Sequence, residues 1–402
     1  MNPDAHLLWR APQWALAVLL ACLGMLGPFS IDTYLPAFAG IARALGATPV
    51  EMQQTLSSYL AGFALMSLFH GALSDSVGRR PVILWGVAIF ALASAGCALS
   101  RSIGWLVFFR FVQGLSAGAG MVVSRAIIRD MFPPVDAQRV MSQVTLFFGV
   151  APAVAPIVGG VLIVHASWPA IFWCLAGFGV LLGAATWRWL PETLHLGERQ
   201  PFGVAPLMKG YAALGLDPRF AALALASGIP FNGMFLYVLS APVFLGEHLH
   251  LPPTRFYEHF VLAIGGIMAG AWCSGRLAGR LSPKRQVRIG FAVMTLTALA
   301  NLALNLVAVP AAPWALLPIG VDSFGWALMV PVVTLMVLDL VPERRGMASS
   351  LQACVGSAAN GLVAGVVSPW GMHSTAALAA ASLAMSGIGL AAWLWVRGRI
   401  VP

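Results

Sequence analysis

Long apolar stretches recur along almost the whole chain, and they set the strongest constraint on its fold. A transmembrane helix needs about 20 consecutive, mostly apolar residues, and windows of that size predict about twelve such helices here. Charged residues make up only 9% of the 402 residues, whereas a soluble domain carries roughly 25%. The sequence therefore predicts an all-α integral membrane protein with spans at Trp14–Pro36, Gln53–Gly71, Pro81–Leu99, Gly104–Ser124, Val140–Val164, Trp168–Trp187, Phe220–Leu245, Tyr257–Ser274, Ile289–Val309, Trp314–Leu338, Met347–Pro369 and Thr375–Val396.

Lysine and arginine are distributed unevenly between the loops. If the N-terminus is cytoplasmic and the chain crosses at every span, only Arg43, Arg101 and Arg255 fall on the outer side, and Arg110 lies inside a span. Cytoplasmic loops of membrane proteins carry an excess of these residues, so the pattern predicts that both termini are cytoplasmic. The same effect explains the net charge of +9 without a nucleic-acid partner.

The longest polar gap divides the chain into two halves that resemble each other. It predicts a six-helix bundle over 1–190, a cytoplasmic linker over 191–219 and a second six-helix bundle over 220–402. The sequence after the fourth span, "RDMFPP", has the same D-x-x-P spacing as "LDLVPERR" after the tenth. Duplicated halves are typical of secondary transporters, which bind substrate between the halves near the membrane midplane.

A polar motif follows the second span and is repeated in weaker form after the eighth. The first copy is "GALSDSVGRRP", which contains Gly71, Asp75, Gly78, Arg79 and Arg80, and the second is "GRLAGRLSPKR". Gly279 occupies the position of Asp75 in the second copy. Anchoring of the arginines at the cytoplasmic membrane surface would explain Arg79 and Arg80, but it would not explain the acid between them and the span.

Four motifs, which follow one another along the chain, resemble those of the major facilitator superfamily. They are "SIDTYLPAF" in the first span, the loop motif after the second, "RFVQGLSAG" in the fourth span and "GVAPAVAPIVGG" in the fifth. The first-span motif is similar to that of the bicyclomycin-resistance (Bcr/CflA) branch of drug–proton antiporters, as are "RQPFG" and "SGIPFNGMF". The resemblance implies twelve transmembrane helices in two pseudo-symmetric six-helix bundles, acting as a monomer.

The resemblance also assigns a role to the loop motif. It implies that Asp75 meets the N-terminus of the eleventh helix, where an anion is favoured, and that Arg79 pairs with an acid at the end of the fourth helix, for which Asp130 is the candidate. Together these contacts would form a cytoplasmic gate that holds the outward-facing state.

The motif of the fifth span has a direct physical interpretation. Pro152 and Pro156 remove backbone donors and bend a helix, while Gly149, Gly159 and Gly160 allow a neighbouring backbone to approach closely. We expect a kinked, closely packed helix that can seal a cavity. An ordinary proline kink is the alternative.

Charged side chains inside the spans are the strongest candidates for chemistry. Only Asp32, Arg110 and Asp322 lie well within predicted spans, and intramembrane charges are functional by default because inserting them is costly. Asp32 and Arg110 lie at similar depth, so they could form a structural ion pair. Alternatively, Asp32 carries the transported proton, since Arg110 always stays charged. Asp322 could be a second proton site, the partner of a cationic substrate or a structural acid.

Few polar groups accompany these charges, which favours a cavity that binds by apolar contact. The candidates for lining it are Tyr34, Gln113, Phe231, Asn232 and Phe235, although Asn232 is better explained by a hydrogen bond between helices.

The function predicted from these features is proton-coupled efflux of small, largely apolar drug-like compounds across a bacterial cytoplasmic membrane. An exporter of a small metabolite such as cysteine is the alternative, and a membrane enzyme is a remote one. The chain has neither a D-D-x-x-D run nor an H-E-x-x-H motif, and its five cysteines lie far apart in apolar stretches. We therefore expect no catalytic residue, no bound metal, no cofactor and no disulfide.

Overall fold

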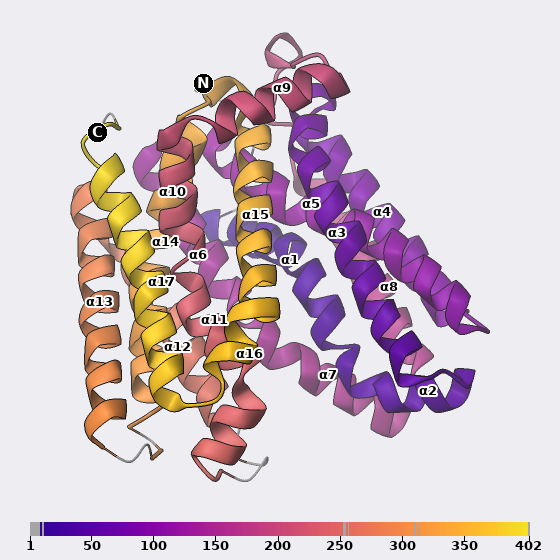
Figure 1. Ribbon diagram of the computed structural model, residues 1–402. Coiled ribbons are helices and arrows are strands. Elements are labelled where there is room, and N and C mark those ends of the chain that lie inside the picture. The colour runs from indigo at the N-terminus through magenta and orange to yellow at the C-terminus, as the bar shows by residue number, and fades with distance from the viewer. Residues whose placement is uncertain are drawn as a thin grey trace. The chain divides into compact units, whose positions relative to one another are not determined.

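Helices account for nearly all of the chain in the computed structural model, which describes residue 9 and residues 12–251, 255, 257–308, 311–312 and 314–400 (Figure 1). Within these ranges there is no β-strand, only an isolated bridge between Ala278 and Leu281. The α-helices are α1 Gln13–Asp32, α2 Phe38–Leu45, α3 Pro49–Val77, α4 Arg79–Ala98, α5 Ile103–Met131, α6 Pro134–Phe148, α7 Ala151–His165, α8 Pro169–Trp189, α9 Val204–Gly215, α10 Pro218–Gly228, α11 Phe231–Leu239, α12 Tyr257–Leu277, α13 Pro283–Val307, α14 Leu317–Asp339, α15 Arg345–Leu362, α16 Ser368–Gly371 and α17 Thr375–Val396.

Most of the predicted spans correspond to single long helices. In the described ranges, ten helices are long and apolar enough to cross a membrane. The predicted seventh span is the pair α10 and α11, bent by 42°. The predicted fifth span also differs from a single helix, because it consists of α6 and α7, which have 15 residues each. Both exceptions contain proline and glycine close to the break, which is where helices bend.

The helices gather into two compact units, and each unit takes a segment from the far half of the sequence. Unit 1 contains residues 1–133, 150–208 and 341–351, and unit 2 contains residues 134–149, 209–340 and 352–402. Helix α6 therefore belongs to unit 2, and the first residues of α15 belong to unit 1. The division into two bundles at a linker over 191–219 stays a prediction, and that stretch contains all of α9.

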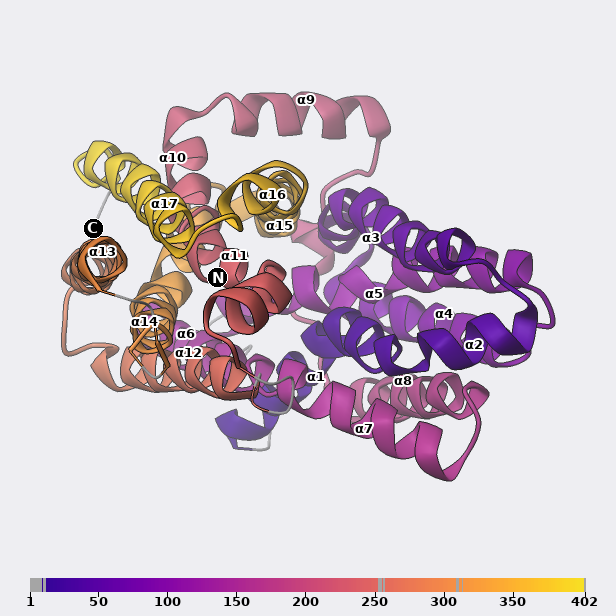
Figure 2. The ribbon, with the colours of Figure 1, turned by 60° about the horizontal axis from the view of Figure 1, so that its bottom comes forward.

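In unit 1, close contacts between backbones hold the helices together. Helix α5 packs on α3 and α4, and α4 packs on α8 (Figures 1 and 2). A Cβ on Gly62 of α3 would collide with the carbonyl oxygen of Phe111 in α5, and a Cβ on Gly114 would collide with that of Tyr59. Small residues serve this purpose in membrane proteins, where helices associate through packing.

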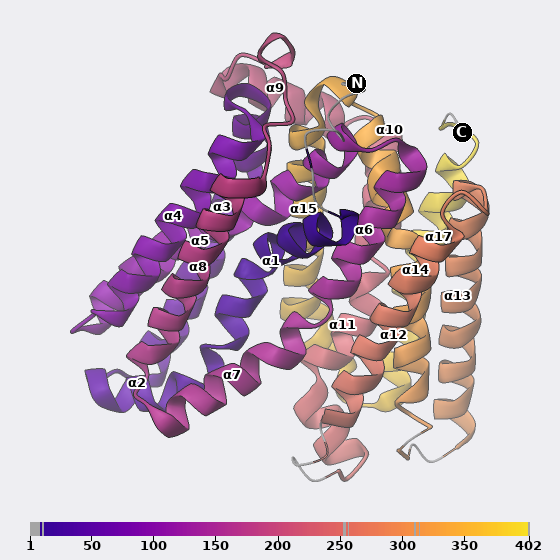
Figure 3. The same ribbon diagram turned by 180° about the vertical axis from the view of Figure 1, so that it is seen from behind.

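Unit 2 uses the same device between α12 and α14. A Cβ on Gly266 would collide with the carbonyl oxygen of Gly320, and a Cβ on Gly270 with that of Phe324. Helix α6 lies along α12 and also contacts α14 (Figure 3), while α13 packs on α14 and α17.

Three buried polar side chains link α6, α12 and α13 in unit 2. Gln138 Nε2 donates to Gln286 Oε1 at 2.8 Å. Gln286 Nε2 donates to Ser274 Oγ and to the carbonyl oxygen of Leu328 in α14, both at 2.8 Å. We call Gln138, Ser274 and Gln286 the amide cluster. None of the three carries a charge, and all are buried.

Local signals define the start of α3 at the opposite end from the gate motif. Thr48 accepts from the Glu51 backbone N–H and donates its own N–H to the Glu51 carboxylate, so the two form a capping box. These hydrogen bonds hold the pKa of Glu51 below its ordinary value. Proline at the first helical position reinforces the start of the helix.

Candidate functional site

Charged residues of the predicted gate meet where α3 ends, α4 begins and α5 ends, all within unit 1. Arg79 Nε donates to Asp130 Oδ2 at 3.0 Å, and Arg79 Nη1 donates to Asp75 Oδ1. Arg345 Nη1 donates to the other oxygen of Asp130 at 2.8 Å. The side chains of Arg79, Asp75 and Asp130 are 2%, 5% and 8% exposed. Buried charges are costly unless they are paired, so these four residues, the charged cluster, form a single electrostatic unit.

The N-terminus of α15 completes the charged cluster. Gly346 N–H donates to Asp75 Oδ1 at 3.1 Å, and Met347 N–H donates to Asp75 Oδ2 at 2.9 Å. The first N–H groups of a helix have no partner inside the helix and carry partial positive charge. One carboxylate therefore neutralises both a guanidinium and a helix end. This is the contact that the resemblance implies for Asp75.

Close backbone contact brings α3 and α15 together at this point. A Cβ on Gly71 would collide with the carbonyl oxygen of Gly346, and a Cβ on Gly346 would collide with that of Gly71. Gly71 N–H also donates to Ser350 Oγ at 3.0 Å, and that hydroxyl donates to the carbonyl oxygen of Ser67 at 2.6 Å. The two helices therefore touch where neither carries a side chain.

Glu192, which follows α8, caps the start of α4. Its carboxylate accepts from the backbone N–H of Arg79 at 2.9 Å and from that of Arg80 at 3.2 Å. Gly78 lies between α3 and α4 with φ +115°, a conformation that other residues rarely adopt. The Arg80 side chain donates to the carbonyl oxygen of Trp187. Glu192 thus helps to orient the helix that carries Arg79.

Arg110 of α5 lies fully buried in a cage of tyrosine rings. Its guanidinium carbon is 4.6 Å from the centre of the Tyr34 ring and 4.3 Å from that of Tyr59. Arg110 Nη1 donates to Gln113 Oε1 at 2.6 Å, while Nε and Nη2 have no partner within the described residues. Aromatic faces stabilise a cation, so this charge is held without a carboxylate.

Asp32 does not pair with Arg110 in this structure. It is the last residue of α1, it is half-buried, and no hydrogen bond or ion pair joins it to another described residue. Tyr34, two residues further on, covers the guanidinium and shares a hydrogen bond of 2.6 Å with Thr55. The ion pair that helix depth allowed as an alternative is therefore replaced by cation–π contact, which leaves the carboxylate of Asp32 available to other partners.

The motif of the fifth span brings α7 against the end of α1. A Cβ on Gly159 would collide with the carbonyl oxygen of Thr33, directly after Asp32. Gly149 lies in the break between α6 and α7, whereas a Cβ on Gly160 would meet no described atom within 4 Å. The side chains of Pro152 and Pro156 fall outside the described part of the structure. Of the three glycines, Gly159 makes the close approach expected of them.

Residues of the predicted cavity in unit 2 contact their neighbours in different ways, and Asp322 lies in the same unit. Phe231 and Phe235 stack with ring centres 5.6 Å apart, and Phe231 also contacts Trp326. Asn232 has no exposed surface, and its Nδ2 donates to the carbonyl oxygen of Gly228 at 3.0 Å. Asp322 of α14 is 5% exposed, and neither of its carboxylate oxygens has a partner among the described residues.

Comparison with models of protein families identifies the family of this chain. The model of the Major Facilitator Superfamily matches residues 20–365. The chain belongs to this superfamily. A bicyclomycin resistance protein homolog from Haemophilus influenzae is 30% identical to this facilitator, over 86% of this chain and 84% of that protein. Multidrug resistance protein D from Escherichia coli is 31% identical over 66% of this chain and 67% of that protein.

Solved structures agree on the fold of the facilitator. The Major Facilitator Superfamily transporter FucP, solved in the outward conformation, aligns with a TM-score of 0.76 over 97% of this chain and 99% of that one. The two sequences are 13% identical, so the comparison concerns the fold alone. The chain is a multi-pass membrane protein of a transporter family.

Sequence reasoning missed four residues that contact the predicted gate motif. They are Glu192, Arg345, Gly346 and Ser350. A signal for two of them was present, because "ERRGM" places arginine and glycine at the start of the eleventh helix. Nothing in the sequence alone indicates that Glu192 caps a helix more than 100 residues earlier, since that contact depends on tertiary folding.

Proposed function

We propose that this facilitator exports small, largely apolar drug-like compounds from the bacterial cytoplasm in exchange for protons. The observation that carries the proposal is the similarity to a bicyclomycin resistance protein homolog over 86% of the chain. The similarity to multidrug resistance protein D supports the same substrate class. The protein would act as a monomer in the inner membrane with both termini in the cytoplasm, in line with the asymmetry of lysine and arginine between the loops.

Asp32 is the group that would carry the proton. A carboxylate beside a guanidinium favours the ionised form, whereas desolvation favours the protonated form. The carboxylate of Asp32 makes no ion pair with another described residue, and Nε and Nη2 of the buried Arg110 have no partner in that part of the chain. A change of conformation that brings the two together would release the proton, and one that separates them would take it up. Substrate in the same cavity would compete with the proton.

The charged cluster would control which side is open. With Asp75 bound to the N-terminus of α15, the contact between α3 and α15 is closed. Opening it would break two charge-assisted hydrogen bonds and expose Arg79.

The membrane potential supplies the energy for export. One proton crossing 100 mV supplies about 2.3 kcal/mol, which corresponds to roughly a 50-fold substrate gradient.

Drug-driven proton movement in proteoliposomes tests the proposal. Bicyclomycin and a panel of apolar drugs, with cysteine as a metabolite, would be presented to the native protein and to Asp32→Asn. We expect proton-coupled transport of at least one drug to fall by about tenfold or more in Asp32→Asn, because an amide does not titrate. Drug exchange down a gradient without a proton requirement should remain.

Asp136→Asn is the matched control. Asp136 pairs with Arg139 at an exposed position, with side chains 33% and 49% exposed, and such pairs contribute little. Its transport should equal that of the native protein. Undiminished proton coupling in Asp32→Asn would show that Asp32 is not the carrier, and transport of cysteine but no drug would contradict drug export.

A further inference from the structure

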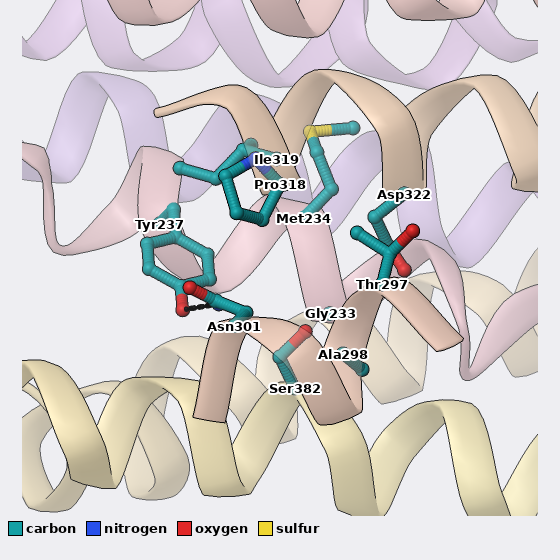
Figure 4. A pocket seen from close by; sticks show the side chains of 10 residues that line it. All are labelled: Gly233, Met234, Tyr237, Thr297, Ala298, Asn301, Pro318, Ile319, Asp322 and Ser382. Atoms are coloured by element: carbon teal, nitrogen blue, oxygen red, sulfur yellow. Dashed lines mark hydrogen bonds between the residues drawn. The ribbon is translucent and has the colours of Figure 1, made fainter. Parts of the chain in front are cut away.

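A small cavity inside unit 2 surrounds a carboxylate that the transport mechanism does not use. The space that a water-sized sphere can occupy in it is about 10 Å³, and it lies between α11, α13, α14 and α17. Figure 4 shows Asp322, Thr297 and Ser382 around one part of it, with Tyr237 and Asn301 further along the wall. Drug-sized sites have volumes of about 300–1,000 Å³, so this cavity is too small for a drug.

Asp322 enters this cavity without a partner. The residue is 5% exposed, and neither Oδ1 nor Oδ2 makes a hydrogen bond with any described residue. An isolated buried carboxylate is strongly unfavourable unless a positive charge neutralises it. No lysine, arginine or histidine is among the described residues that line the cavity. The carboxylate can therefore be neutralised only by a proton or by a bound cation.

Oxygen atoms form the polar part of the lining. Ser382, Thr297 and Tyr237 each contribute a hydroxyl group. The Nδ2 of Asn301 is already engaged, since it donates to Tyr237 Oη at 2.8 Å (Figure 4). A carboxylate with hydroxyl groups is a hard oxygen set of the kind that suits hard cations. In the described parts of the chain no three His, Cys, Asp or Glu side chains gather, so a transition metal lacks its usual ligands.

Gly233 creates the space between two of these oxygens. A Cβ built on Gly233 would lie 2.9 Å from Ser382 Oγ and 3.6 Å from Asp322 Oδ2. Gly233 therefore faces both the hydroxyl group and the carboxylate, and a side chain at 233 would enter the space between them. A single carboxylate balances a single positive charge.

We propose that this cavity binds one sodium ion, held by Asp322 and the hydroxyl groups of Ser382 and Thr297. The site lies within unit 2, whereas Asp32 and Arg110 belong to unit 1. It goes beyond the proposed drug–proton exchange, which needs no sodium. Bound sodium would stabilise the packing of α13, α14 and α17 around the carboxylate.

Thermal unfolding of the purified protein tests the site. The melting temperature would be measured at fixed pH and equal ionic strength in sodium, potassium or choline chloride, together with binding of radioactive sodium. We expect sodium alone to raise the melting temperature of the native protein and to bind at one ion per chain. Asp322→Asn should lose both effects.

Two further variants keep the test decisive if Asp322→Asn folds poorly. Gly233→Ala fills the site with a methyl group and changes no ligand, so it should fold and lose sodium binding. Asp32→Asn should keep sodium binding even though proton coupling is lost, which separates this proposal from the previous one. Equal melting temperatures in the three salts, or sodium binding that persists in Asp322→Asn, would overturn it. Stabilisation by acid alone, absent in Asp322→Asn, would identify a proton as the occupant and also overturn it.

Discussion

The charged cluster of unit 1 and the amide cluster of unit 2 occupy corresponding helices of the two halves, yet they use different chemistry. The charged cluster joins α3, α4, α5 and the start of α15 through Asp75, Arg79, Asp130 and Arg345. The amide cluster joins α12, α13, α14 and α6 through neutral hydrogen bonds. The internal sequence repeat explains the correspondence, because the loop motif after the second span recurs after the eighth.

The difference follows from one position of the repeated motif. Where the first copy has Asp75, the second has Gly279, which adopts φ +78° in a turn. Without this acid, the second copy has nothing to bind a helix N-terminus, and side-chain amides link the helices instead. Removing one partner of a buried ion pair lowers the free energy of unfolding much more than removing one partner of a neutral hydrogen bond. We therefore expect the two clusters to respond differently to substitution.

The largest effect is expected from Asp75→Asn. The substitution removes one of the two carboxylates that pair with Arg79. It also places a neutral side-chain amide, instead of a carboxylate, against the N–H groups of Gly346 and Met347. Breaking a buried pair in this way costs about 3–5 kcal/mol, so the melting temperature and drug transport should both fall. Thermal unfolding in detergent and transport in proteoliposomes measure these effects, with Asp136→Asn as the control. Native stability in Asp75→Asn would show that the charged cluster contributes no more than the amide cluster.

A pair of glycine substitutions sharpens the comparison. Gly71 and Gly275 occupy the same position of the two motif copies, but a Cβ on Gly71 would collide with the carbonyl oxygen of Gly346, whereas the nearest atom to a Cβ on Gly275 is Ser142 Cβ at 3.5 Å. Overpacking costs typically about 1–3 kcal/mol. We expect Gly71→Ala to lower the melting temperature and to impair transport, while Gly275→Ala behaves like the native protein. Equal behaviour of the two variants would contradict a tighter contact in unit 1.

The smallest effect is expected from Ser274→Ala in the amide cluster. The substitution removes one acceptor of Gln286 Nε2, which keeps its hydrogen bond to the carbonyl oxygen of Leu328. A neutral hydrogen bond contributes about 0.5–1.5 kcal/mol, so a small decrease in melting temperature and unchanged transport should result. A loss as large as that in Asp75→Asn would mean that the amide cluster also controls transport.

Sequence patterns predicted the fold well, because the length of each apolar stretch is a property of a continuous segment of the chain. The motif also named three residues that meet in the structure, since Arg79 donates to both Asp75 and Asp130, while their role as a gate stays a prediction. Three-dimensional packing decided what the sequence could not. Arg110 and Asp32 lie at similar depth, but two tyrosine rings cover the guanidinium and the pair does not form. Side-chain direction around a helix, rather than depth along it, determines such contacts.

The exchange of segments between the units has a consequence for synthesis on the ribosome. Residues 341–351, which complete unit 1, are made after residues 134–149 and 209–340 of unit 2, and α6 is made long before α12, α13 and α14, with which it forms the amide cluster. Neither unit can reach its final packing while the chain is still short. In the nascent protein, α6 and the C-terminal end of α3 must therefore remain without their final neighbours until the eleventh span has entered the membrane. A chain that ends before Val341 lacks part of its first unit.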